Sequence, residues 1–570
     1  MQKQNPQTAY RKHAILIGTI SENCDKITNG EYELMKQVLR ITSDSFLWGM
    51  VLFVANIFYC CGPLMPIADA GINVIFLMIA ICMVVNFIRY RKSLFAFYWI
   101  PAILVIWYFL SIAVNKGNVV DIKLGVYYIV FLLFATNVWN DRKIEDLFTI
   151  FAKITCWIGM LINVPSILLY YTSYYKVFTS DVMSMALIFG RHPNGALYGI
   201  LCNSNWLAVF CLLVLGMSAY LLLQGKNRVF YGIDFLVALI ALVMSASRGG
   251  LVGAFAFAFV YAVLYIYNKK KRGERLTALL QTALAGCLMV AVLFGIVSLI
   301  KVANNALYNT VVGWSSETQI ESVEEEPESA ESAAVQEEEE EPESAESATA
   351  QEEEEEPESA ESATAQEEEE EPESAESAAV QDAEEESENV GSEDEAKNDA
   401  DNAEALTERD PEEKKSSTQI RLELWRSGLK VIRKHPVFGV GPHNLAENIL
   451  ANAETENITD ELATNTHNIF IQVAVSIGLV GLLLFCICIA VPCVLGLRYI
   501  FSACSDNADS MITAIAIVAG FCVVNLVEAD LLSKNFIATV FWMLVGFIWF
   551  AVREKKSQNN SNGVKSEEVA

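Results

Sequence analysis

The stretch TQIRLELWRSGLKVIRKHPVFGVGPHN, residues 418–444, is followed after a polar spacer by TNTHNIFIQVAVSIGLVGLLL, residues 464–484. The first part is polar and basic, and it places Arg421 and Trp425 four residues apart. The second part places a His-Asn pair directly before a long apolar run. Apolar runs of about 18 residues or more can cross the hydrocarbon core of a bilayer as helices. The stretch therefore predicts a polar, partly basic segment at the rim of a membrane.

Further runs of this kind occur along the whole chain, nearly free of charged residues. The twelve candidates are residues 46–64, 71–88, 94–114, 122–139, 147–171, 201–223, 229–246, 250–267, 276–300, 469–497, 511–528 and 535–552. Helices satisfy all their backbone hydrogen bonds internally, which a segment in hydrocarbon requires. The sequence predicts an all-α polytopic membrane protein with about 12 transmembrane helices and one large extracytoplasmic loop.

The formal net charge of -29 comes from one insert. Between Glu317 and Lys415 there are 43 Asp or Glu and 4 Lys or Arg, so the remainder of the chain carries a net charge of +10. The insert repeats with a 15-residue period, which is marked by Pro327, Pro342, Pro357 and Pro372. Glu, Ser, Ala and Pro without aromatic residues cannot bury enough apolar surface to offset chain entropy. We predict that residues 316–416 are disordered, as a tolerated repeat expansion in a surface loop. Cation binding and repulsion of anionic polymers remain alternatives.

The Lys and Arg residues of the short loops predict the orientation. One alternating set of loops carries 13 of them and the opposite set carries 6, with the long loop excluded. Cytoplasmic loops are enriched in Lys and Arg, so we expect both termini in the cytoplasm. The predicted divisions are a cytoplasmic segment 1–45, nine helices in 46–300, an extracytoplasmic loop 301–468, three helices in 469–552 and a cytoplasmic tail 553–570. Within the loop, residues 418–468 form the amphipathic part after the repeats.

The thirteen cysteines do not form a recognisable framework. Nearly all fall inside apolar runs, where cysteine behaves as a small buried hydrophobic residue. No Cys and His cluster has the spacing of metal ligands, so the sequence predicts no metal site.

Arg248 follows Ser247 at the outer boundary of the seventh predicted span, in the sequence SASRGG. An arginine at the centre of a span costs about 2.5 to 3.5 kcal/mol on insertion scales, and less near an end. A guanidinium group binds phosphate oxygens in a bidentate fork, and the adjacent glycines would let a bulky anion approach it. The sequence favours an anion-binding arginine over one that only anchors the helix at the interface.

Polar residues also precede the sixth predicted span. Arg191 and His192 lie before it on the outer side, and Asn203 and Asn205 follow just inside the span. An amide in hydrocarbon must find hydrogen-bond partners. Two interpretations remain open, namely contacts between helices and a polar lining for a glycan or phosphate passage.

Residues 419–434 predict an amphipathic helix. Apolar residues alternate with Arg421, Arg426, Lys430 and Arg433, which is typical of a helix lying in the membrane interface with its apolar side in lipid. An ordinary surface helix is the alternative. His435-Pro436 ends the helix.

Four short motifs occur in order on the predicted outer side. They are NSNWLA at 203–208, SRG at 247–249, R-x-x-x-W with HPVFGVG between Arg421 and Gly441, and HNIFIQVAVSIGLVG at 467–481. Together they resemble the O-antigen ligase and polymerase superfamily of bacterial membranes. The resemblance covers roughly residues 188–550, and the acidic repeats interrupt it.

The resemblance implies a metal-independent glycosyltransferase that needs no cofactor and takes a glycan from an undecaprenyl-diphosphate carrier on the outer face. It implies that Arg248 and Arg421 bind the diphosphate and that His467 activates the acceptor hydroxyl. Single displacement would invert the anomeric carbon. The implied partners are the carrier-linked glycan, an acceptor glycan or lipid, the bacterial plasma (inner) membrane and other polysaccharide-assembly proteins, without nucleic acid.

Other polar residues near these motifs complete the predicted site. We expect substrate to be bound by Arg191, Asn205, Trp425, Asn468 and Glu528. Asn468 would orient the imidazole ring or cap the following helix. His435 and His443 are alternative bases, and Glu528 or Asp530 is an alternative base or acceptor-binding acid.

Two other functions remain open on the sequence. A transporter or flippase of lipid-linked oligosaccharides would also have about twelve spans and buried arginines. Such proteins usually show internal repeats and ionisable groups near mid-membrane, whereas here the charged residues gather at one face. A membrane-anchored display protein would depend on the acidic tract, so deletion of residues 324–386 would abolish its function.

Overall fold

The computed structural model describes most of the chain outside the acidic insert. The described residues are 41–89, 98–139, 143–180, 185–193, 195–225, 227–269, 295–304, 306–308, 417–454, 458–502 and 508–567, together with the single positions 37, 40, 281, 284, 287 and 292. The predicted repeats at 316–416, most of the predicted segment 1–45 and most of the predicted span 276–300 lie outside them.

Helices account for most of the described structure. In chain order they are α3 (Ser45–Tyr59), α4 (Met65–Arg89), α5 (Ile100–Val114), α6 (Val119–Tyr128), α7 (Ile144–Tyr171), α8 (Ser204–Leu223), α9 (Arg228–Met244), α10 (Arg248–Lys269), α13 (Ser417–Lys434), α14 (Leu445–Leu450), α15 (Asp460–Ala463), α16 (Ile469–Ser502), α17 (Asp509–Val524) and α18 (Phe536–Glu567). Short turns are η1 (Gly62–Leu64), the π-helical η3 (Ile129–Phe134) and η4 (Ala135–Asn137).

Seven helices among the described residues are long and apolar enough to cross a membrane. They include α4, α7, α8, α10, α16, α18 and the continuous segment Val119–Asn137, and α3, α5 and α17 are shorter apolar helices. The predicted helical membrane fold is confirmed in outline. The total of twelve spans stays a prediction.

A small sheet departs from the all-α prediction. Strands β1 (Tyr175–Ser180), β2 (Met185–Arg191) and β3 (Leu197–Gly199) form an antiparallel sheet in the order β1-β2-β3. The segment is rich in aromatic and aliphatic residues, and pairing of its strands satisfies the backbone groups of the connection between α7 and α8. These strands were not predicted from the sequence, because they lie beside much longer apolar runs.

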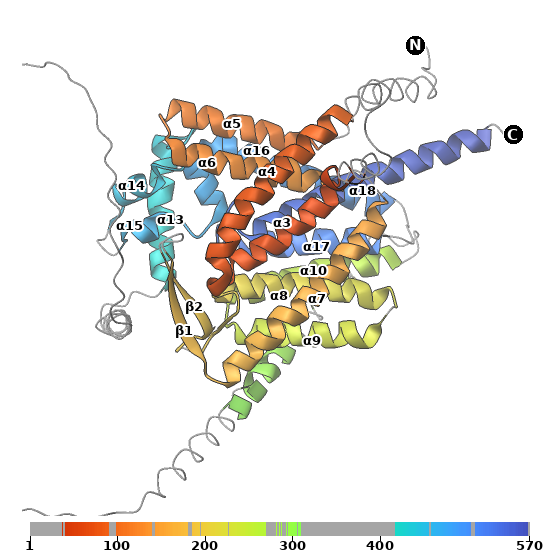
Figure 1. Ribbon diagram of the computed structural model, residues 1–570, viewed down its shortest axis with the longest axis horizontal. Coiled ribbons are helices and arrows are strands. Elements are labelled where there is room, and N and C mark those ends of the chain that lie inside the picture. The colour runs from red at the N-terminus through yellow and green to blue at the C-terminus, as the bar shows by residue number, and fades with distance from the viewer. Residues whose placement is uncertain are drawn as a thin grey trace, which may run out of the picture. The chain divides into compact units, whose positions relative to one another are not determined.

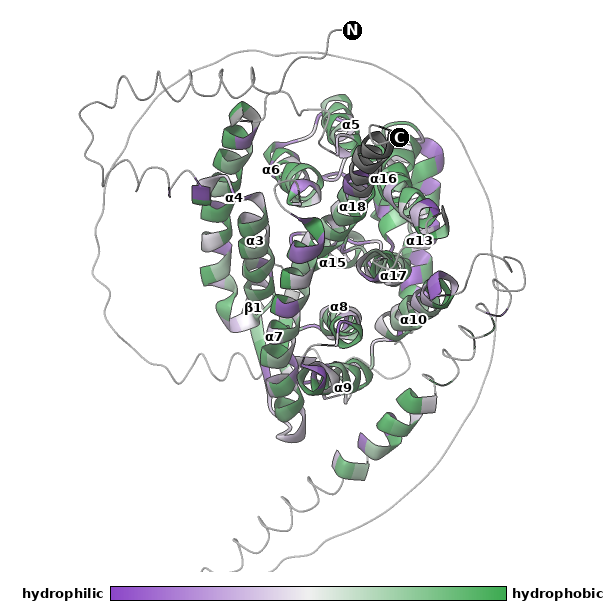
Figure 2. Ribbon diagram, turned by 90° about the vertical axis from the view of Figure 1, so that its right-hand side faces the viewer, coloured by the Kyte–Doolittle hydropathy of each residue, from purple (hydrophilic) through white to green (hydrophobic). Residues whose placement is uncertain are grey.

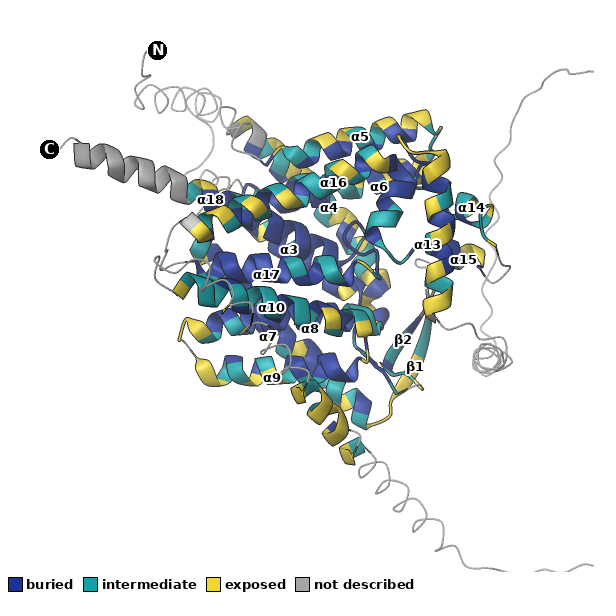
Figure 3. Cartoon of the chain, turned by 180° about the vertical axis from the view of Figure 1, so that it is seen from behind, coloured by how far each residue is buried: buried dark blue, intermediate teal, exposed yellow. Residues whose placement is uncertain are grey.

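The helices differ strongly in burial. Figure 3 shows α8 and α17 largely buried, whereas α4, α5 and α9 carry exposed residues. The exposed apolar residues of α4 recur at helical spacing and are Ile67, Val74, Leu77, Ile81, Val84 and Ile88. Figure 2 shows apolar residues on the outer sides of the helices as well as between them. An apolar face that recurs in this way, and that none of the described helices covers, is typical of a lipid-facing surface.

Figure 1 shows α13, α14, α15 and the sheet together at one end of the helical array, with α13 running across that end. α13 packs Leu424 and Val431 into a cluster with α14 and α16, while Leu422 and Leu429 are exposed. The expectation that the apolar side of this helix lies in lipid is therefore wrong for its main apolar face. That face is covered by protein because α14 and α16 supply a matching apolar surface.

α16 is interrupted two turns after its start. Ile477 and Gly478 have non-helical backbone angles, and the loop after α13 fills the gap. The N–H groups of Val440 and Gly441 donate to Val475 O and Ser476 O, both at 2.9 Å. A Cβ at Gly478 would lie 2.0 Å from Val437 O, so only glycine fits there. The HPVFGVG motif is thus a backbone clamp on the break, and it fixes the short first segment of α16.

Candidate functional site

The carboxylate of Glu528, in the loop between α17 and α18, contacts side chains from distant parts of the chain. Glu528 Oε1 accepts hydrogen bonds from Asn205 Nδ2 at 2.7 Å and from Arg421 Nη2 at 3.0 Å. His467 Nδ1 lies 3.4 Å from Glu528 Oε2. The Glu528 side chain is only 11% exposed, and the Arg421 and His467 side chains are 29% and 28% exposed. A nearly buried carboxylate requires such partners, and the mixture of burial and access is suited to a reaction site.

Four helices begin at this site, each with a polar side chain capping its first turn. The side chains accept hydrogen bonds from backbone N–H groups of α8, α10, α16 and α18, and the capping residues are Asn203, Ser247, Asn468 and Asn535. Cys202, Ala246 and His467, which precede the first three caps, have positive φ. Helix N-termini carry partial positive charge and attract anions. Their convergence makes this end of the protein electrostatically suited to a negatively charged group.

The start of α16 is fixed directly to the loop that carries Glu528. Ile469 N donates to Asn525 O at 3.1 Å and to Glu528 O at 3.0 Å, and Asn468 Nδ2 donates to Leu526 O at 2.9 Å. His467 has a left-handed backbone with φ of 49°, and its N–H donates to Asn465 Oδ1. A left-handed conformation in a residue other than glycine is uncommon and is held by surrounding contacts. The imidazole is therefore directed toward Glu528 by backbone geometry as well as by its own contact.

Arg248 is the first residue of α10 and is exposed. The preceding Ser247 donates through Oγ to Asn205 Oδ1 at 2.7 Å, which links α10 to the Glu528 cluster. A Cβ at Gly249 would lie 3.0 Å from Val527 Cγ2, so the start of α10 lies against the same loop. A Cβ at Gly250 would lie 2.3 Å from Ala208 Cβ. The glycine at this position serves helix packing, in contrast to the expectation that it opens a path for an anion.

Trp425 lies one turn after Arg421 on α13. Its indole Nε1 donates to Thr466 O at 2.9 Å, next to His467. The contact attaches α13 to the segment that carries the imidazole. Trp425 therefore fixes the relative position of Arg421 and His467, and Asn468 is observed as a helix cap.

A second polar network, which was not predicted from the sequence, lies beside Glu528. Asp530 is buried, and its Oδ1 accepts from Trp206 Nε1 at 3.3 Å and from Asn535 Nδ2 at 3.1 Å. Burial and the neighbouring Glu528 carboxylate raise the pKa of Asp530 to about 7. The NSNW motif contained a signal for this network. Asn203 caps α8, Asn205 binds Glu528, and Trp206 binds Asp530.

Arg191 lies away from the Glu528 contacts, at the end of β2. Its guanidinium carbon is 4.0 Å from the ring centroid of Tyr308 and 5.1 Å from that of Tyr170. Of the alternative bases, His443 donates its backbone N–H to Asp121, and His435 is exposed just after α13. Among the described histidines, only His467 contacts Glu528.

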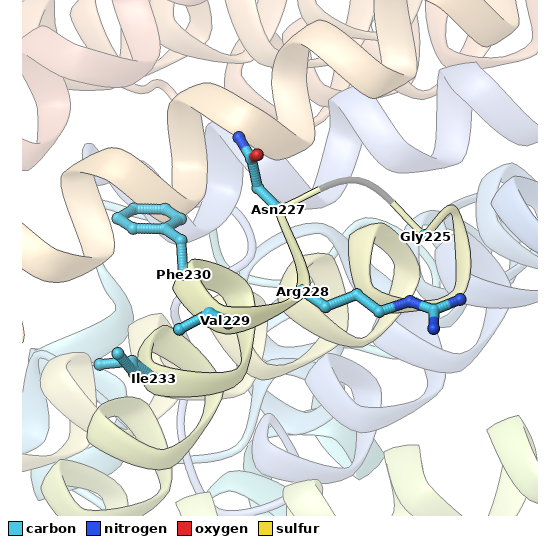
Figure 4. Close-up of a pocket in the computed structure, with 6 residues that line it drawn as sticks. All are labelled: Gly225, Asn227, Arg228, Val229, Phe230 and Ile233. Atoms are coloured by element: carbon cyan, nitrogen blue, oxygen red, sulfur yellow. The ribbon is translucent and has the colours of Figure 1, made fainter.

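A separate depression of about 600 Å³ lies at the turn between α8 and α9. It is lined by Gly225, Asn227, Arg228, Val229, Phe230 and Ile233 (Figure 4). Asn205 is in the first turn of α8, and this depression follows its last turn. A helix of this length spans about 30 Å, so the depression is not part of the candidate site.

The apolar helices and the polar end define a polytopic membrane protein with a candidate anion-binding site at one end. Residues 233–486 match the family described as O-antigen ligase (Wzy_C), a region that includes Arg248, Arg421 and His467. This region of the chain is therefore similar to the O-antigen ligase family, and the predicted resemblance to the O-antigen ligase and polymerase superfamily is confirmed. The matched region is a little less than half of the chain. A comparison with curated proteins finds no match.

Proposed function

We propose that this protein transfers or polymerises glycans from an undecaprenyl-diphosphate carrier on the outer face of the bacterial plasma membrane, in the assembly of a cell-surface polysaccharide. The observation that carries the proposal is the convergence of Arg421, His467 and Asn205 on Glu528, beside the start of α10. These residues lie far apart in the sequence. Their meeting in one partly exposed site supports a shared chemical role.

In the proposed reaction, an acceptor hydroxyl attacks C1 of the carrier-linked sugar. A bond forms between the acceptor oxygen and C1, the bond from C1 to the diphosphate oxygen breaks, and the configuration at C1 inverts. The leaving diphosphate gains negative charge, and the acceptor loses one proton. A site for this reaction needs cationic groups for the diphosphate and a base for the proton.

His467 would accept the proton. Nδ1 of His467 faces Glu528 Oε2. In the tautomer with the proton on Nδ1, the lone pair of Nε2 would be free to accept the proton of the acceptor hydroxyl. The carboxylate would then hold the ring and stabilise the imidazolium that forms, as an acid does beside a catalytic histidine. This gives Glu528 a positioning role in place of the acceptor-binding role suggested by the sequence.

Arg248 and Arg421 would bind the diphosphate without a metal or cofactor. Arg421 is held by Glu528, while Arg248 is exposed at the start of α10 and makes no ion pair among the described residues. The N-termini of α8, α10 and α16 would add partial positive charge at the same place. Asn205 would keep the carboxylate of Glu528 aligned between them.

The test compares His467→Ala, Arg421→Ala and Arg248→Ala with the matched controls His435→Ala and Arg426→Ala, which alter exposed residues of the same region. Each variant is placed in cells that lack the gene, and both surface polymer and carrier-linked glycan are measured. We expect the first three to lose transfer while remaining in the membrane, and the controls to retain it.

The accumulating species identifies the reaction. Short carrier-linked units indicate a polymerase, and full-length carrier-linked chains indicate a ligase. Normal polymer in His467→Ala and Arg421→Ala would contradict the proposal. Glycan retained on the inner leaflet would indicate a transporter instead.

A further inference from the structure

Arg191 lies in an aromatic cluster at the end of the protein that also carries the candidate site. The cluster is formed by the guanidinium of Arg191 and the rings of Tyr170 and Tyr308, whose centroids are 5.5 Å apart. Tyr170 is 4% exposed, and Tyr308 is half-buried. Arg191 Nε is buried and has no hydrogen-bond partner among the described residues. The cluster therefore contains an arginine with unused hydrogen-bonding capacity between two aromatic faces.

Hydroxyl and amide groups surround this cluster. Tyr171 Oη donates to Asn304 Oδ1 at 2.5 Å, Asn304 Nδ2 donates to Tyr170 Oη at 3.4 Å, and Ser173 Oγ lies 3.0 Å from Tyr308 Oη. Beside it, His192 stacks on Tyr198 with ring centroids 5.0 Å apart. A sugar ring presents C–H groups on its faces and hydroxyl groups at its edge. Aromatic faces with a negative centre attract the former, and amide, hydroxyl and guanidinium groups bind the latter.

The cluster is connected to the candidate site by a short piece of chain. Tyr198 belongs to β3, and Asn205, which binds Glu528, lies seven residues later. Seven residues span at most about 25 Å, so a short oligosaccharide could extend from the transfer site to the cluster.

Anchoring in the membrane interface is the ordinary role of exposed tyrosines. It does not account for Tyr170, which is buried, or for an arginine placed between rings with a buried Nε. It also does not account for the network of polar side chains that joins α7 to Asn304. These features are typical of a binding site whose side chains are already held in position.

We propose that Arg191, Tyr308 and the His192–Tyr198 pair form a glycan subsite that binds a sugar unit of the substrate at a distance from the reacting carbon. This inference rests on the proposed function and adds to it a subsite for the carbohydrate itself, separate from the diphosphate and the base. The ligand chemistry is that of an oligosaccharide, on either the donor or the acceptor.

The experiment measures binding of lipid-free oligosaccharide to the purified full-length chain in nanodiscs by saturation-transfer NMR and titration. The probe is a set of short oligosaccharides released by mild acid from the carrier lipid of the cells that make this protein. The variants are Tyr308→Ala, Tyr308→Phe, Arg191→Gln and Arg191→Lys. His467→Ala tests independence from the transfer chemistry, and Tyr267→Ala is a control for an aromatic residue that pairs with Phe501 at the C-terminal end of α10.

We expect Tyr308→Ala and Arg191→Gln to weaken binding at least about tenfold. Arg191→Lys should also weaken it, because lysine keeps the charge but loses the planar group. His467→Ala and Tyr267→Ala should bind as the unmodified protein does. Unchanged affinity in Arg191→Gln and Tyr308→Ala overturns the subsite, and if Tyr308→Ala does not fold, Arg191→Gln and Tyr308→Phe decide.

Two further comparisons complete the test. Carrier-linked donor without acceptor and free acceptor glycan are titrated separately, and the one whose affinity falls in Arg191→Gln identifies the glycan that occupies the subsite. Because binding is measured without turnover, a protein that binds oligosaccharide through Arg191 but shows no transfer would disprove the proposed function and leave the subsite intact.

Discussion

Glu528 and Asp530 lie two residues apart in the same loop but have different surroundings. Glu528 is nearly buried, as Asp530 is, and it contacts Arg421, His467 and Asn205. Asp530 is buried, and its described side-chain partners are the neutral donors of Trp206 and Asn535. The same chemical group is thus placed among cationic or titratable side chains in one case and among neutral ones in the other.

The difference between these two carboxylates lies in their surroundings and not in the type of group, and it supports a separate role for each. Two carboxylates in one site often take different roles because their environments differ. Here Glu528 has the partners of a positioning group for catalysis. Asp530 has the partners of a group that joins α8, the loop and the start of α18.

The largest effect is expected when Glu528 is neutralised, and neutralising each carboxylate without a change in size tests whether the two groups have different roles. Glu528→Gln removes the ion pair with Arg421 and the negative charge next to His467. We expect the transfer rate to fall about 10²- to 10⁴-fold, as when an acid that orients a catalytic histidine is replaced by its amide. Initial rates with a carrier-linked donor in nanodiscs measure this effect.

Asp530→Asn is the matched control. Its Oδ1 acceptor is preserved, so we expect a rate within about tenfold of the unmodified protein, which corresponds to about 1.4 kcal/mol. Equal loss of activity in the two variants would show that the two carboxylates do not have separate roles.

The next largest effect concerns the break in α16, which holds His467 in position. Gly478 has φ of 76° and lies against Val437 O. We expect Gly478→Ala to destabilise the protein by about 1 to 3 kcal/mol and to reduce transfer, while leaving the Asp530 network intact. Thermal unfolding in detergent measures the loss.

Gly232→Ala is the control for this substitution, because nothing lies within 4 Å of a Cβ at that position of α9. It should not lower the Tm, since alanine is the better helix former. A Gly478→Ala protein as stable as Gly232→Ala would mean that the clamp of the HPVFGVG loop is not needed to hold the break.

A smaller effect is expected in the dependence of stability on pH. The pKa of Asp530 is raised by burial and by Glu528, so the folded state retains a proton that the unfolded state loses above the ordinary aspartate pKa. The contribution of this group to stability is therefore complete below about pH 4 and decreases as the pH rises toward 7. Asp530→Asn should flatten the fall in Tm across this range, and an unchanged profile would contradict the assignment.

The smallest effect is expected at a second ion pair of α13. Lys430 Nζ lies 2.8 Å from Glu454 Oε1, but the two side chains are 38% and 62% exposed. Water and salt screen exposed pairs, so their contribution is small. Glu454→Gln should leave transfer and Tm unchanged, in contrast to Glu528→Gln. A large loss of activity would show that distance, and not burial, governs the importance of these pairs.

Sequence patterns predicted the helical segments better than the contacts between them. Long apolar runs predicted α7, α8 and α16 because length and apolarity alone suit a helix in hydrocarbon. The sheet at Tyr175–Gly199 was missed, since its strands are short and are stabilised by pairing with each other. The break at Gly478 was also missed, because it depends on a loop that approaches from the end of α13.

Hydropathy along the chain was sufficient to predict a membrane protein of many apolar helices, and the sequence motifs identified Arg248, Arg421 and His467 as candidates for one site. These properties are local, because hydropathy and short motifs are read along the chain. The contacts of Glu528 with Asn205, Arg421 and His467 depend on the tertiary structure, because these residues are 323, 107 and 61 positions away along the chain. The burial of Asp530 among the neutral donors Trp206 and Asn535 also depends on the tertiary structure. Such partners are chosen by how helices pack and where their ends meet, and no spacing along the chain encodes that.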